Sequence, residues 1–348
     1  MNHNIFIQRC IDLAYKGLGI VSPNPMVGAV LVHDNKIIGE GWHQKYGEAH
    51  AEVNCINSVS EENKKYIADS TLYVSLEPCN HFGKTPPCSD LILKHQIKKV
   101  VVGCVDANPK VGGSGIKKLL DNKVEVIYPV LEDDCKQLNK RFFAFHQKHR
   151  PYIFLKWAQT NDGFIAAENC KAIKISNSEV DLAIHQMRSN ESAIMVGFNT
   201  ALYDNPKLTA RLGVRVNQPL RIVMDRKNEL PPTHFLLADE FKTLILNESI
   251  HEKRGVKEFV KIDFNNSIID QLMNLLFEKN ITSLIVEGGA KLLQRFIVAD
   301  LWDEALVITN TEMNIKKGIK SPVFQNKKLV EKKLFGNNGI SFFINIDS

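Results

Sequence analysis

Apolar runs of strand length alternate with stretches of helical spacing along the chain, and this alternation restricts the fold more than any other feature of the sequence. It predicts an α/β fold, in which helices flank a partly parallel sheet. The order is interrupted at Arg150–Pro151, where proline disfavours a preceding helical residue and a new apolar run begins. A length of 348 residues is also more typical of two domains than of one. We therefore predict a boundary near residues 146–151, with domains at residues 1–146 and 147–348.

Each half has its own series of predicted elements. In the first half we predict helices at residues 5–18, 49–57 and 89–95, a hairpin of strands at residues 27–32 and 36–41, and further strands at residues 71–75 and 99–104. In the second half we predict strands at residues 152–157, 193–197, 220–225, 243–247, 283–287 and 306–309, and an amphipathic helix at residues 291–298. The second series favours a mostly parallel sheet flanked by helices.

Charge and cysteine content restrict the partners and the location. Lys and Arg number 44 against 39 Asp and Glu, and the resulting net charge of +5 does not require a nucleic-acid partner. No apolar run approaches the roughly 18 residues of a membrane span, and MNHNIFIQRC lacks the apolar core of a signal peptide, so we expect a cytoplasmic protein without a membrane partner. The basic stretch at residues 316–333 is expected to be solvated surface. Seven cysteines form no disulfide framework, and only Cys79 and Cys88 lie outside apolar or helical contexts.

The clearest chemistry comes from a histidine, a glutamate and two cysteines. His50-Ala51-Glu52 precedes Pro78-Cys79 and Cys88, which offers Zn²⁺ three ligands and leaves the fourth position for water. Zinc lowers the pKa of this water, and Glu52, in the first turn of the same predicted helix as His50, is placed to move protons. His50 alone would more often be a surface or core histidine. The combination favours a catalytic zinc site, because structural sites more often have four protein ligands.

The loop between the two cysteines is unusually wide. It contains eight residues, NHFGKTPP, in place of the two of a C-x-x-C spacing. We expect this loop to offer substrate contacts, and we expect His81 within it to be a surface histidine and not a ligand. Helix N–H groups near Cys79 would favour its thiolate form.

A strand in the second half leads into a glycine pair and a helix. The order in Ser283–Ala290 leaves N–H groups at the helix start that could hold a phosphate, which suggests a nucleotide-type ligand. Since G-x-G-x-x-G is absent from the sequence, no Rossmann fingerprint is inferred, and a simple helix-start turn remains the alternative. Glu287 stands at the carboxyl end of the strand, where open α/β sheets bind ligands.

Several segments along the whole chain form a recognisable family pattern. In the first half they are Pro23-Asn24-Pro25-x-Val27-Gly28-Ala29-Val30, Gly39-x-Gly41-x-His43, His50-Ala51-Glu52, Glu77-Pro78-Cys79-x-x-x-Gly83-Lys84-Thr85-Pro86-Pro87-Cys88 and Asp106-Ala107-Asn108-Pro109-x-Val111-x-Gly113-x-Gly115, where Ala107 replaces the usual proline. In the second half they are Lys156–Gly163, with Thr160 in place of serine, and Asp204-Asn205-Pro206-x-Leu208-Thr209-x-Arg211, with Asn205 in place of aspartate. In these segments the chain resembles the bifunctional deaminase–reductase family of riboflavin biosynthesis.

For the first domain, the resemblance implies a cytidine-deaminase-like α/β/α sandwich. It would remove the ring 2-amino group of a pyrimidinone ribosylamine 5′-phosphate as ammonia. The implied zinc ligands are His50, Cys79 and Cys88, the implied proton shuttle is Glu52, and the implied substrate contacts are Asn24, His43, Lys84 and Asn108. For Asn24 and Asn108, which adjoin prolines, a role in forming turns stays equally open.

For the second domain, the resemblance implies a dihydrofolate-reductase-like α/β domain that uses NADPH to reduce the ribose at C1′. Ala158, Lys174, Thr200, Asp204 and Gly289 would lie along NADPH, and Arg188, Leu208, Arg211 and Glu287 along the substrate. Guanidinium forks suit the substrate phosphate. Candidate general acids are Lys156, Asp162 and Glu287, and Arg226 is a candidate for the cofactor 2′-phosphate. We expect a homo-oligomer.

Two other functions use the same zinc pattern. The first is a nucleobase or tRNA-editing deaminase with an accessory nucleotide-binding domain, although the first half has mixed charges and lacks basic patches interleaved with aromatic residues. The second is a zinc-stabilised binding protein whose second domain senses a nucleotide. Glu52 argues against it, since a structural zinc does not need this carboxylate.

Overall fold

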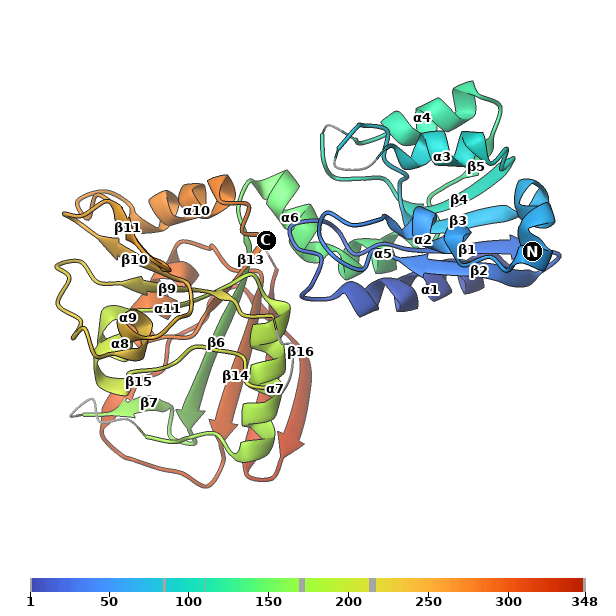
Figure 1. Ribbon diagram of the computed structural model, residues 1–348. Helices are drawn as coiled ribbons and strands as arrows, with labels where there is room; N and C mark the ends of the chain where they lie inside the picture. The colour runs from blue at the N-terminus through green and yellow to red at the C-terminus, as the bar shows by residue number, and fades with distance from the viewer. Residues whose placement is uncertain (1, 84–85, 110, 169–172, 213–216, 347–348) are drawn as a thin grey trace. The chain divides into compact units, whose positions relative to one another are not determined.

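The computed structural model describes residues 2–83, 86–109, 111–168, 173–212 and 217–346, which form two compact units (Figure 1). The units are Met1–His149 and Arg150–Ser348. Residue 146 lies inside the last helix of the first unit, α6 (Lys140–Lys148), and the division comes at the end of this helix. Within the described residues, no helix is both long and apolar enough to span a bilayer.

The first unit contains five strands and eight helical segments among its described residues. In chain order they are α1 (His3–Ala14), η1 (Tyr15–Gly17), β1 (Gly28–His33), β2 (Lys36–Trp42), α2 (Ala51–Asn57), η2 (Glu61–Asp69), β3 (Thr71–Leu76), α3 (Cys88–Lys94), β4 (Lys99–Cys104), α4 (Ser114–Asp121), β5 (Glu125–Ile127), α5 (Glu132–Leu138) and α6.

These strands form one sheet between two layers of helices. The order is β2-β1-β3-β4-β5, antiparallel for the β1–β2 and β1–β3 pairs and parallel for the other two. Alternate residues of a strand enter different cores: Val30 packs with residues of α1, α5 and α6, whereas Leu31 packs with residues of α2, α3 and α4. This period of two buries both faces of the sheet and confirms the predicted α/β/α sandwich.

The second unit is built on one large sheet. Its elements are β6 (Tyr152–Thr160), β7 (Phe164–Ala167), α7 (Ser178–Asn190), β8 (Ala193–Val196), α8 (Phe198–Asp204), β9 (Leu220–Met224), α9 (Phe235–Ala238), β10 (Thr243–Asn247), β11 (Glu252–Arg254), β12 (Lys257–Lys261), α10 (Ile268–Glu278), β13 (Ser283–Val286), α11 (Ala290–Val298), β14 (Glu304–Asn310), β15 (Gly318–Lys320), β16 (Lys327–Phe335) and β17 (Asn338–Asn345).

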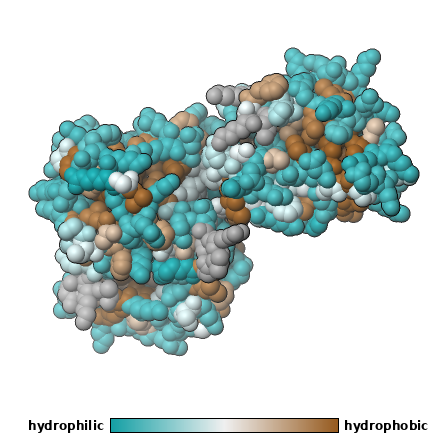
Figure 2. Space-filling model, in the orientation of Figure 1, coloured by the Kyte–Doolittle hydropathy of each residue, from teal (hydrophilic) through white to brown (hydrophobic). Residues whose placement is uncertain are grey.

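Ten of these strands pair in the order β11-β12-β10-β9-β8-β13-β6-β14-β17-β16. From β12 to β14 the neighbours are parallel, as predicted, and the strands at both ends are antiparallel. Helices α10 and α11 pack into the large core, while α7 packs with Leu306 and Ile308 of β14 in a separate core. Figure 2 shows mostly hydrophilic residues, with smaller hydrophobic patches, on the face in view.

Candidate functional site

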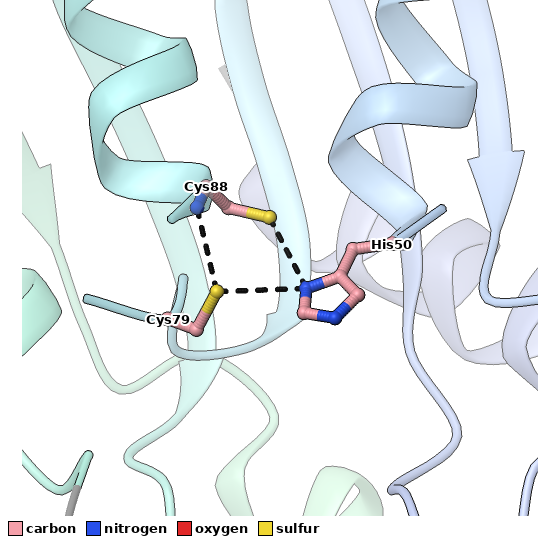
Figure 3. A group of neighbouring side chains, drawn as sticks. All are labelled: His50, Cys79 and Cys88. Carbon is pink, nitrogen blue, oxygen red and sulfur yellow. Dashed lines mark hydrogen bonds between the residues drawn. The ribbon is translucent and has the colours of Figure 1, made fainter. Parts of the chain in front are cut away.

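Three predicted ligands come together in the first unit (Figure 3). His50 is the N-cap of α2, Cys79 follows β3, and Cys88 begins α3. His50 Nδ1 lies 3.5 Å from the Sγ atom of Cys79 and 3.3 Å from that of Cys88. The candidate ligand atoms lie within 4.8 Å of one another. Segments that are far apart in sequence thus present one nitrogen and two sulfurs to a common point.

Hydrogen bonds prepare one of the two sulfurs as a thiolate. The bond from the Cys88 side chain lowers the pKa of Cys79 to about 4, with further help from His50. The backbone N–H of Cys88, at the start of α3, also donates to Cys79 Sγ at 3.3 Å. This agrees with the predicted helix N–H groups near Cys79. The bond to Cys79, together with burial, raises the pKa of the Cys88 thiol. A divalent ion would ionise both thiols on coordination.

This donor set fits zinc and has a carboxylate beside it. Imidazole nitrogen and thiolate sulfur are preferred zinc ligands, and three of them leave a tetrahedral position for water. Glu52 lies in the first turn of α2 and is only 3% exposed. Its side chain is within hydrogen-bonding reach of Cys88, and burial raises the pKa of its carboxyl group. A raised pKa suits a group that takes up and releases protons near neutral pH.

His43 and Asn24 lie next to this cluster. His43 Nδ1 donates to the Ala49 carbonyl at 3.0 Å, so the neutral ring accepts at Nε2 from Asn24 Nδ2 at 3.1 Å. Burial lowers the pKa of His43, which favours this neutral form. The ring centroids of His43 and His50 are 5.5 Å apart. Both predicted substrate residues are therefore part of the metal-site neighbourhood.

Of the remaining predicted residues of this site, the structure describes Asn108. Asn108 is in the loop before α4, where its N–H donates to Asp106 Oδ1 at 2.7 Å. Burial raises the pKa of Asp106 to about 7. Lys84 lies outside the described residues. His81 is exposed and is not one of the clustered ligands, in agreement with its assignment as a surface histidine.

The second unit has a cavity of about 1010 Å³ at the carboxyl ends of β8 and β13. Strand β13 pairs with β6 only as far as Leu155, so the next residues of β6 extend past it and line the cavity. The predicted cofactor and substrate residues that line it are Ala158, Lys174, Thr200, Asp204, Gly289, Arg188, Leu208 and Glu287. Arg211 is exposed and is not among the lining residues.

The cavity fits a large anionic cofactor. A Cβ atom added at Gly289 would lie 3.2 Å from Thr200 Oγ1, and Gly288 has a φ of +117° that favours glycine. Both positions thus keep backbone accessible at the start of α11. The cationic lining residues, apart from the predicted substrate contact Arg188, are Lys156, Lys174, Arg226, Lys227, Lys291 and Arg295. Such a lining attracts phosphate groups.

A buried ion pair crosses the cavity floor. Arg188 Nε and Nη2 donate to the two carboxylate oxygens of Glu287 at 2.9 and 2.7 Å, and Lys156 Nζ lies 3.8 Å from Glu287 Oε2. Burial alone would raise the pKa of Glu287, but the charges of Lys156 and Arg188 outweigh it and lower the value to about 2. The Arg188 fork, which we expected to be available for phosphate, is therefore engaged with Glu287.

Two other predicted residues have clear local roles. Leu208 is buried with a φ of +53°, and the neighbouring Thr209 carbonyl accepts from Arg188 Nη1 at 3.4 Å. Asp162, a candidate general acid, accepts from Thr160 Oγ1 at 2.5 Å and from the Lys316 N–H at 2.8 Å. These bonds lower the pKa of Asp162, and the residue does not line the cavity. Asp162 therefore anchors a loop and is not in a position to donate a proton to a substrate in the cavity.

Comparison with known proteins gives the class of enzyme first. The family described as the cytidine and deoxycytidylate deaminase zinc-binding region matches residues 1–104, and the RibD C-terminal domain family matches residues 151–311. The chain is thus a deaminase joined to a reductase, with Zn²⁺ and NADPH as the cofactors of the two activities. This confirms the predicted fold class and cofactors and favours neither alternative function.

Similar proteins then give the family. The riboflavin biosynthesis protein RibD of Aquifex aeolicus is 38% identical over 87% of this chain and 85% of its own length, and that of Escherichia coli is 32% identical over 88% and 87%. A solved structure from Thermotoga maritima, titled a diaminohydroxyphosphoribosylaminopyrimidine deaminase/5-amino-6-(5-phosphoribosylamino)uracil reductase, matches with a TM-score of 0.90 at 35% identity, over 99% of this chain and 98% of that one. This chain belongs to the RibD family of bifunctional riboflavin biosynthesis enzymes.

Proposed function

We propose that the first unit deaminates 2,5-diamino-6-ribosylamino-4(3H)-pyrimidinone 5′-phosphate and that the second reduces the ribosyl group of 5-amino-6-(5-phosphoribosylamino)uracil to ribityl. The observation that carries the proposal is the His50–Cys79–Cys88 cluster with Glu52 beside it, in a chain that also holds a cation-lined cofactor cavity. The Thermotoga maritima protein, whose title states both reactions, supports it across nearly the whole chain. We assign the deaminase to residues 1–146 and the reductase to residues 147–348.

In the deaminase, we assign the metal to His50, Cys79 and Cys88. When bound, zinc makes a hydroxide available near neutral pH. Glu52 takes a proton from the attacking water and returns it to the departing amino group, so that the ring amino group is replaced by oxygen and ammonia leaves.

The substrate ring would be held by polar groups around this centre. Because Asn24 donates its Nδ2 hydrogen to His43, its Oδ1 is turned to accept from a ring N–H. We assign His43, Asn108 and Lys84 as further substrate contacts, with Lys84 suited to the phosphate.

In the reductase, NADPH supplies the hydride to C1′ of the ribose. We assign Ala158, Lys174, Thr200, Asp204 and Gly289 to the cofactor, and Arg188, Leu208, Arg211 and Glu287 to the substrate. Since the Arg188 fork pairs with Glu287, Arg211 is the better phosphate contact.

A proton must reach O4′ as the sugar ring opens. Glu287, with a pKa of about 2, is ionised at neutral pH and does not donate it. Asp162 is engaged in its loop. Lys156, which lines the cavity 3.8 Å from Glu287, is the candidate that remains.

We further propose a homo-oligomer that acts on small molecules in the cytoplasm, without nucleic acid. Strand β16 is the edge of the large sheet and is exposed throughout, including the apolar residues Leu329, Val330 and Leu334. A second copy covering this edge would remove the exposed apolar surface. Six described cysteines are free thiols, as is usual in a reducing compartment.

The test is a coupled assay on the purified chain, with ammonia release and NADPH absorbance followed separately. With the diaminopyrimidinone substrate we expect ammonia first and NADPH oxidation after it, and removal of zinc by a chelator should abolish both. With the deaminated product supplied directly, NADPH oxidation should survive chelation. Ammonia release without any NADPH oxidation would show that the second unit serves another substrate.

A further inference from the structure

A buried carboxylate that the proposed chemistry does not use lies two residues before Cys79. Glu77 follows β3 and is 3% exposed. Its Oε1 accepts the N–H groups of Gly115 and Ile116 at 2.8 and 3.1 Å, and its Oε2 accepts those of Gly113 and Asp106 at 2.8 and 3.2 Å. All four donors belong to residues 106–116, the segment that carries Asn108.

Hydrogen bonds within the segment also hold its first residues together. Asp106 Oδ1 accepts the Asn108 N–H at 2.7 Å, and the Asn108 carbonyl accepts from Val111 and Gly112 at 2.8 and 2.9 Å. The position of Asn108 therefore follows the position of Asp106, which Glu77 binds directly.

Other contacts bring the end of the segment against the cysteine loop. A Cβ atom added at Gly115 would lie 1.9 Å from the Pro78 carbonyl oxygen, so the start of α4 rests on the residue before Cys79. Asn80 Nδ2 also donates to the Ser114 carbonyl at 3.4 Å. Glu77 thus lies where the cysteine loop and the Asn108 segment meet.

We infer that Glu77 is a positioning residue of the deaminase, which fixes Asn108 relative to the metal ligands. An ionised carboxylate has about four acceptor sites, and here four N–H groups occupy them in charge-assisted hydrogen bonds. Glutamine has the same shape, but it offers one oxygen and would turn an NH₂ group toward two N–H donors. The inference depends on the proposed role of Asn108 as a substrate contact.

The experiment compares Glu77→Gln, Asn108→Ala and the double variant in the full-length zinc-loaded enzyme. We expect Glu77→Gln to raise the KM of deamination by about tenfold, the effect of losing one hydrogen bond between Asn108 and the substrate. Its kcat should stay within about threefold of the wild type. The amount of bound zinc should not change, and neither should the rate at which the reductase converts the deaminated product when this product is supplied directly. Glu62→Gln, the same substitution at an exposed residue of η2, is the matched control and should have no effect.

The double variant separates a positioning role from a general structural one. If Glu77 acts through Asn108, the double variant should be no worse than Asn108→Ala alone, because the two changes disrupt one interaction. Glu77→Asp, which keeps the charge and both oxygens, should restore part of the wild-type KM.

Four results would overturn the inference. Additive effects would show that Glu77 and Asn108 act independently. Loss of zinc in both Glu77 variants would show that Glu77 supports the metal loop itself. A normal KM in Glu77→Gln together with a raised KM in Asn108→Ala would remove only the role of Glu77 and leave the proposed function intact. A normal KM in Asn108→Ala would refute the substrate contact on which the role of Glu77 depends.

Discussion

Replacing Glu287 by glutamine should destabilise the second unit and stop its reductase activity. The pKa of Glu287 falls from 4.5 to about 2 in the folded protein, and each unit corresponds to 1.36 kcal/mol, so the folded state favours the ionised form by about 3 kcal/mol. The side chains of Glu287 and Arg188 are only 8% and 12% exposed, so solvent screens the pair little. Glu287→Gln would leave Arg188 and Lys156 buried without a countercharge, and we expect a loss of about 3 kcal/mol in the free energy of unfolding.

The contribution of Glu287 to the stability of the second unit depends on pH. Because folding lowers the pKa of Glu287, its contribution is complete above about pH 4.5 and is lost as the pH falls from there to about 2. The wild type should therefore lose more stability over this interval than the variant does.

Denaturant unfolding followed by tryptophan fluorescence measures this difference. In a Trp42→Phe background, the signal comes only from Trp157 and Trp302 of the second unit. The matched control is Glu248→Gln, which breaks the exposed pair with Arg226 and should cost less than about 1 kcal/mol. Deamination should be normal in both variants. If Glu287→Gln unfolds like this control, the buried pair does not stabilise the unit as we reason.

Three further predictions concern catalysis and cofactor binding. Glu52→Gln should retain zinc, measured by metal analysis, yet lose about a hundredfold or more in the rate of ammonia release; persistent deamination would contradict its role in proton transfer. Gly289→Ala should raise the KM for NADPH about tenfold, because the added Cβ would meet Thr200 Oγ1 at 3.2 Å, while the rate of deamination should not change. Arg226→Ala should raise the KM for NADPH about tenfold and leave that for NADH unchanged; an equal change for both cofactors would exclude a contact with the 2′-phosphate.

Strands that are buried on both faces were predictable from the sequence. The predicted strands at residues 99–104 and 243–247 agree with β4 and β10, in which all residues but Lys99 are buried. Strand β16 was missed because all its residues are exposed, so its sequence KKLVEKKLF has no alternation of apolar and polar residues. We interpreted this stretch only as basic surface, and it is indeed exposed, but it is also an edge strand paired with β17.

The sequence predicts the parts of the candidate site in which the chemistry restricts the residue type. It does not predict the contacts between distant side chains or with backbone groups. The three candidate zinc ligands, which the structure brings together, could be predicted because few side chains bind this ion and their spacing is restricted. The pairing of Arg188 with Glu287 joins residues 99 positions apart, and spacing gives no sign of it. Glu77 binds four backbone N–H groups, and since every residue except proline has this donor, its partners carry no signal in the sequence.

Two departures from the family pattern in the reductase, at Thr160 and Asn205, preserve the contacts on which the local structure depends. A third, Ala172 where the family often has a hydroxyl residue, lies outside the described residues. Thr160, in place of serine, keeps a hydroxyl that donates to Asp162 and accepts the Phe164 N–H at 3.0 Å. Asn205, in place of aspartate, ends α8 with a φ of +42°, a conformation that asparagine tolerates well. Its Oδ1 accepts the Phe235 N–H at 2.9 Å, a bond that an amide oxygen makes as readily as a carboxylate oxygen does. Since Asp204 immediately precedes this cap and lines the cavity, the substitution removes one charge but keeps the geometry that presents Asp204 to the cavity.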